Sequence, residues 1–131
     1  MAAYAITRDV AGPFPEAVER VTAALAAEGF GVLTTIDVAE TLKRKLDLEL
    51  PAYVILGACN PTLASRGLAA EPDLGVLLPC NVVVRAAGDR VHVAAMEPVA
   101  AMELAGNEAL APLAAEARER IERAVATLEE V

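Results

Sequence analysis

The segment "CNVVVRAAGDRVHVAA", residues 80–95, decides the class of fold. It contains two short apolar runs separated by glycine and aspartate, the pattern of two strands joined in a hairpin. A four-residue loop would place Val84 opposite Val91 and Cys80 opposite Ala95. Two consecutive antiparallel strands argue against a doubly wound parallel sheet, in which helices connect the strands.

Outward from this hairpin, strand and helix patterns alternate along the chain. Strands are predicted over 3–10, 30–36, 52–59, 80–85 and 90–95, and helices over 13–29, 38–46, 61–70 and 112–128. We expect one domain over residues 1–131, an α+β two-layer sandwich with a mixed or mostly antiparallel sheet of about five strands and helices on one face. A doubly wound sheet is the alternative, but no glycine-rich phosphate turn follows the first strand.

Composition limits the partners. The chain of 131 residues carries a net charge of −8 and only 3% aromatic residues, so a nucleic-acid partner is not expected. Its hydrophobic fraction of 56% exceeds that of average domains, which favours burial against a second subunit, yet no run is long enough to span a membrane. The absence of a signal peptide predicts a cytoplasmic protein with reduced thiols, and the length requires no metal for folding.

The two cysteines, Cys59 and Cys80, are the main candidates for chemistry. Asn60 and Pro61 predict a helix start directly after Cys59, because asparagine caps free amides and proline has no amide to lose. The positive end of a helix dipole stabilises a thiolate, so Cys59 is the better candidate for a reactive thiol. Cys80 begins a strand and is expected to pack in the core, a role that also remains open for Cys59.

Two soft sulfur atoms also suggest a monovalent copper ion or haem as ligand. Met96 is a third soft candidate, although its parity in the last strand is opposite to that of the inward residues. A tetrahedral zinc site is not expected, because the cysteine spacing is not CxxC and four ligands are lacking. The candidate ligand-binding residues are Cys59, Asn60, Pro61, Cys80 and Met96, with Cys59 and Cys80 as metal ligands.

Charged side chains offer little else. Lys43, Arg44 and Lys45 form the one basic cluster, which is either a weak anion site or a solvated helix face. His92, the only histidine, alternates with valines and is expected to face solvent. No hydrolase motif accompanies it.

Five motifs together resemble the domain of unknown function 302 family: "EGFGVLTTIDVAETLKRKL", "YVILGACNPTLA", "GVLLPCNVVV", "MEP" and "GNEALAPLA". The likeness extends from Ala3 to Leu128. It implies a compact α+β fold similar to the TATA-box-binding-protein-like architecture, and dimers, but no established reaction. The family's signature falls on Cys59, Asn60, Pro61, Pro79, Cys80 and Pro98. Glu97 stands where the family often has aspartate.

Three functions follow as hypotheses. The first is a non-enzymatic cytoplasmic homodimer that binds a small ligand or soft metal near Cys59 and Cys80. The second is a thiol redox enzyme or sensor with Cys59 as nucleophile and Cys80 as resolving thiol. The third is a purely structural interaction module in which both cysteines pack.

Overall fold

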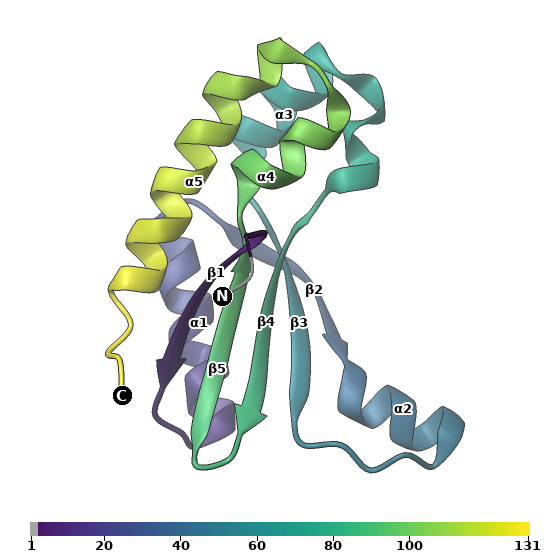
Figure 1. Cartoon of the computed structure of the whole chain (residues 1–131), viewed down its shortest axis with the longest axis vertical. Helices are drawn as coiled ribbons and strands as arrows, with labels where there is room; N and C mark the ends of the chain where they lie inside the picture. The colour runs from purple at the N-terminus through teal and green to yellow at the C-terminus, as the bar shows by residue number, and fades with distance from the viewer. Residues whose placement is uncertain (1–2) are drawn as a thin grey trace.

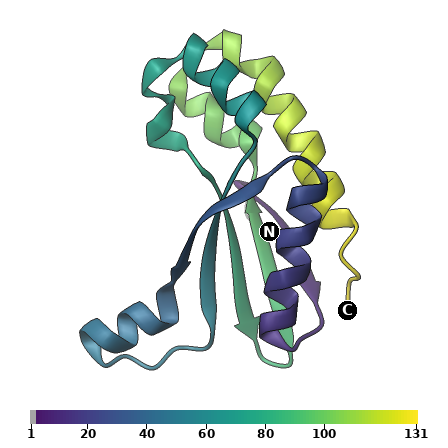
Figure 2. The ribbon, with the colours of Figure 1, turned by 180° about the vertical axis from the view of Figure 1, so that it is seen from behind.

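A computed structural model describes residues 3–131 and contains a five-stranded antiparallel sheet with helices on one face (Figures 1 and 2). In chain order the elements are β1 Ala5–Val10, α1 Phe14–Ala27, β2 Gly31–Asp37, α2 Val38–Leu46, β3 Tyr53–Cys59, α3 Pro61–Ala70, the 3-10 turn η1 Pro72–Leu77, β4 Cys80–Ala87, β5 Arg90–Met96, α4 Pro98–Met102, η2 Glu103–Ala105, η3 Glu108–Leu110 and α5 Ala111–Ala126. The strand order is β1-β5-β4-β3-β2, and every neighbouring pair is antiparallel. The predicted α+β class is confirmed.

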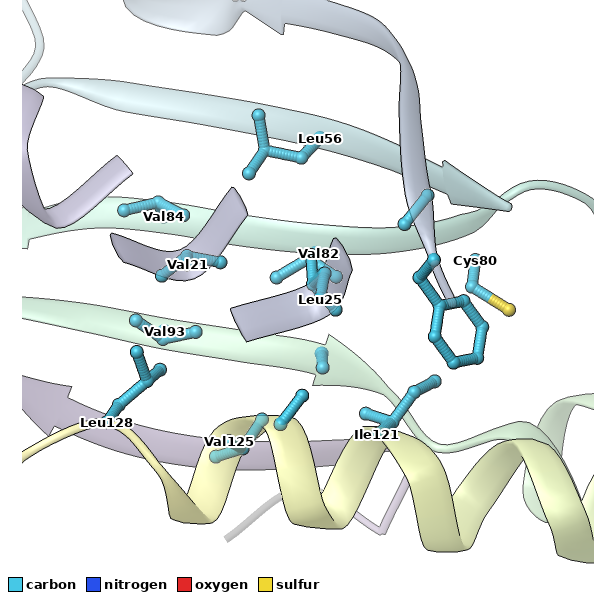
Figure 3. Packing of buried hydrophobic residues seen from close by; sticks show 14 of the residues in the cluster. Val21, Leu25, Leu56, Cys80, Val82, Val84, Val93, Ile121, Val125 and Leu128 are labelled. Carbon is cyan, nitrogen blue, oxygen red and sulfur yellow. The ribbon is translucent and has the colours of Figure 1, made fainter. Parts of the chain in front are cut away.

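The core lies between the sheet and helices α1 and α5. Figure 3 shows Val21 and Leu25 of α1 and Ile121 of α5 directed toward strand residues such as Val82 and Val93. Helix α5 buries alanine, isoleucine and valine side chains at helical spacing, as its sequence predicts. Because both helices cover the same face, the opposite face of the sheet is only partly buried.

The two ends of the sheet differ. At one end, α3, α4 and the beginning of α5 gather beyond the strands, whereas α2 projects from the opposite end (Figure 1). No helix among residues 3–131 is both long enough and apolar enough to cross a membrane.

The hairpin of β4 and β5 has a tighter turn than the sequence analysis predicted. Val84 pairs with Val93 rather than Val91, and the strands continue to Ala87 and Arg90. Only Gly88 and Asp89 connect them, and Gly88 has a φ of 65°, which a two-residue hairpin turn favours. The predicted register was wrong by two residues. Because side chains alternate with a period of two, this shift leaves Cys80 on the helix-covered face.

The pairing of strand β2 with β3 shifts between Val32 and Thr34. A bulge of this kind changes which side chains face the core. Ile36 is 51% exposed, and Leu33 is 69% exposed. Exposed leucines continue through the end of α2 and the following loop at Leu46, Leu48 and Leu50. The homodimer expected from the composition stays a prediction, and these exposed apolar side chains are among those that it could bury.

Gly57 of β3 lies where a side chain has no room. A Cβ atom there would collide with Oγ1 of Thr34 and approach within 2.9 Å of Cγ of Pro79. We therefore expect Gly57→Ala to lower the free energy of unfolding by about 1–3 kcal/mol, measured by urea denaturation. Gly31→Ala is the matched control, since no heavy atom lies within 4 Å of its Cβ position. Equal effects of the two substitutions would contradict the close packing at Gly57.

Candidate functional site

A cavity of about 50 Å³ lies at the end of the sheet where β3 and β4 meet the helices α3, α4 and α5. Both cysteines belong to its wall: Cys59 ends β3, and Cys80 begins β4. The two strands are neighbours, and Cys80 is the partner of Ala58, the residue before Cys59. Antiparallel pairing therefore places the two cysteines, 21 positions apart in the sequence, at adjacent positions of neighbouring strands.

The cavity is almost entirely hydrocarbon. Its wall consists of Phe30, Ala58, Cys59, Asn60, Leu63, Ala64, Gly67, Leu74, Leu78, Cys80, Pro98, Met102, Leu110, Leu113, Ala114 and Ala117. Asn60 is the one side chain in this set with oxygen or nitrogen atoms. Sulfur atoms are therefore the main electron donors that a bound species would meet.

Asn60 holds the start of α3 at the cavity. Its side chain accepts a hydrogen bond of 3.2 Å from the backbone N–H of Leu63, so it caps the helix as the sequence predicts. It is 9% exposed, and a Cβ atom at Gly29 would lie 2.9 Å from its Nδ2. Gly29 has a φ of 85°. The absence of a side chain at this turn therefore lets Asn60 sit close to the backbone.

The Cys80 thiol is held in its protonated form. It is 7% exposed, and Figure 3 shows its sulfur atom at one end of the row of core side chains. Burial, and to a smaller extent the nearby Cys59 charge, together raise the pKa of Cys80 from 9.0 to about 11. Cys59 is half-buried. The pair thus consists of one sealed thiol and one with partial access to solvent.

The remaining predicted site residues lie elsewhere. Pro61 is the exposed first residue of α3 and does not belong to the cavity wall. Met96 ends β5, where it pairs with Ala5, and it also lies outside the wall.

The basic cluster is at the opposite end of the sheet, in the last turn of α2 (Figure 1). Lys43 contacts Asp47 at 2.7 Å and Glu49 at 2.6 Å, and all three side chains are about half exposed or more. Cations in the last turn of a helix also interact favourably with the negative end of the helix dipole. Lys43 therefore has local partners, and none of the three basic residues belongs to the cavity wall.

Sequence reasoning missed Met102, whose side chain is half-buried in the cavity wall. It ends α4, a single turn that Glu97 caps by accepting hydrogen bonds from the N–H groups of Val99 and Ala100 at 3.1 and 2.8 Å. The segment "MEPVAAM" contains a capping residue followed by proline, which signals a helix start. Nothing in the pattern indicates that this turn lines a cavity together with the ends of β3 and β4.

Comparison with known proteins agrees with the fold. A family model described as "Domain of unknown function DUF302" matches residues 6–128. The crystal structure of an uncharacterized conserved DUF302 protein from Bacillus stearothermophilus is 31% identical in sequence and superposes with a TM-score of 0.90, covering 98% of this chain and all of that one. No curated protein matches the chain. The chain belongs to the DUF302 family.

Proposed function

We propose that this protein binds a monovalent copper ion, Cu(I), between the thiolates of Cys59 and Cys80 and has no catalytic activity. The observation that carries the proposal is that both cysteines line one small cavity whose other walls are almost wholly apolar. Thiolates are preferred ligands of Cu(I), and an apolar shell limits the access of competing water.

Size and donor set select the ion over larger ligands. The cavity volume of about 50 Å³ is well below the roughly 300–1,000 Å³ of pockets for organic ligands. Haem, which the sequence left open, does not fit this volume. Zinc prefers four ligands, and among residues 3–131 no three His, Cys, Asp or Glu side chains form a metal-binding group. A two-coordinate soft ion matches two thiolates.

Binding is an exchange of protons for the metal. Cu(I) forms two Cu–S bonds, the two thiols release one proton each, and no electron is transferred. The product carries one net negative charge. Cys59 lies directly before the cap of α3, so the partial positive charge at the start of this ten-residue helix stabilises that product. The cytoplasm, where thiols stay reduced, is the compartment that suits this chemistry.

The elevated pKa of Cys80 weighs against the redox hypothesis. A resolving cysteine must attack as a thiolate, and a thiol with a pKa of about 11 supplies little thiolate near neutral pH. Metal binding does not have this limitation, because Cu(I) displaces the proton of the thiol when it binds the sulfur.

Competition against the Cu(I) chelator bicinchoninate tests the proposal. We expect the reduced wild-type protein to withdraw one Cu(I) per chain from the chelator. Cys59→Ser and Cys80→Ser should each weaken binding tenfold or more, because each removes one of the two soft ligands. Met96→Leu is the matched control, since Met96 lies outside the cavity wall. Failure of the wild type to compete, or undiminished binding by both serine variants, would refute the proposal.

A further inference from the structure

We propose that Cu(I) reaches the cysteine pair through a second hollow on the outer side of the cavity wall. The thioether of Met102 binds the ion transiently and transfers it from this hollow to the cavity. The inference rests on the proposed function. It adds an access route and a transfer ligand to the two thiolates.

The second hollow is a surface groove of about 410 Å³ formed by α4, η2, η3 and the beginning of α5. Met102, Leu110 and Ala114 belong to the walls of both the groove and the cavity. Leu110 is 2% exposed and Ala114 is 4% exposed, so these two form a tightly packed barrier. The groove and the cavity are thus separated by a partition that is only a few side chains thick.

Met102 is the one residue of this shared partition that can bind a soft cation. Leucine and alanine present only hydrocarbon, whereas the thioether sulfur of methionine is a soft ligand for Cu(I). Methionine is also unbranched and flexible, so its sulfur can turn toward either side. Half-burial of Met102 is consistent with contact on both sides.

Two carboxylates give the groove a negative charge, which attracts the positive Cu(I) ion. Glu103 and Glu108 line it and are exposed, and neither forms an ion pair with a lysine, arginine or histidine of residues 3–131. Unpaired charges of one sign in a concave surface raise the local concentration of the opposite ion and its association rate. Carboxylates are hard ligands, so they attract Cu(I) without competing with the thiolates.

Stopped-flow measurement of Cu(I) association, with the ion supplied as its acetonitrile complex, tests this route. We expect Met102→Leu to slow association at least fivefold. The double variant Glu103→Gln/Glu108→Gln should slow it about threefold at low salt, and the difference should shrink as ionic strength rises. The ion enters and leaves by the same path, so a variant that obstructs the path should slow association and dissociation by the same factor. The dissociation constant should therefore stay within about twofold of wild type.

Matched controls separate the route from general effects. Met96→Leu removes a thioether outside both hollows, and Glu16→Gln/Glu19→Gln removes the same charge from α1. Neither should alter the rates. Wild-type rates in the Met102 and groove variants would overturn the proposed route but not the thiolate site. Weaker Cu(I) binding by Met102→Leu with an unchanged association rate would overturn it as well. Loss of Cu(I) binding by the wild type itself would overturn both proposals.

Discussion

We expect Phe30→Ala to lower the free energy of unfolding by about 3–5 kcal/mol, the largest stability effect of the substitutions considered for this chain. Phe30 is 2% exposed and joins the main core to the cavity wall. Its removal forfeits the transfer free energy of the ring and leaves a void that the surrounding helices fill only in part. Urea denaturation monitored by circular dichroism measures the change.

Phe14→Ala provides the matched control. Phe14 is only partly buried, at the first turn of α1, and its loss should destabilise the protein considerably less. Phe30→Leu retains most of the apolar volume and should remain folded if the alanine variant does not, with a loss of less than about 1.5 kcal/mol. Equal losses for Phe30→Ala and Phe14→Ala would show that Phe30 is not a principal support of the cavity wall.

The second large effect concerns the pH dependence of Cu(I) affinity. Cys80 has a pKa of about 11, so below that pH the ion must displace its proton. Each unit of pH increases the available thiolate about tenfold. The apparent association constant should therefore rise at least about a hundredfold from pH 6 to pH 8, which is about 2.7 kcal/mol. Titration against a chelator whose own pH dependence is known measures this slope.

Cys80→Ser isolates the contribution of the buried thiol. In this variant the tenfold-per-unit factor that Cys80 supplies should disappear. An independent check uses the metal-free Cys59→Ser variant, in which the thiolate absorbance of Cys80 should develop only well above pH 9, because burial is the larger cause of its raised pKa. A Cys80 thiol that ionises at an ordinary pH, or a wild-type affinity that does not rise with pH, would contradict this account of the site.

Local sequence patterns predicted those helices and strands whose signals come from residues close together in the chain. The α5 seam around Ile121 and the asparagine cap of α3 depend on neighbours three or four residues away, so they are visible in the chain. The same is true of the hairpin that defines the class of fold. The register of the hairpin was not predictable from the sequence. A two-residue turn at Gly88 and a four-residue loop place the same side chains on the inward face, so the apolar pattern does not distinguish them.

The candidate site was predictable only in part, for a similar reason. Cys59, Asn60 and Cys80 carry signals in their own segments, namely thiols and a helix start. Met102 has no such signal, and it reaches the cavity wall only because α4 packs against α5 at the end of the sheet. Met96, the methionine that the strand pattern singled out, ends β5 and lies outside the cavity wall.

By itself, the sequence determined the α+β class, the antiparallel hairpin and the position of a thiol before a helix, because each depends on interactions within a short segment. The tertiary structure alone decided that the two cysteines share a cavity, how small that cavity is, and that burial raises the pKa of Cys80. Those properties depend on the pairing of β3 with β4 and on the helices packed around them, and the distance between remote side chains is fixed only when the whole core assembles.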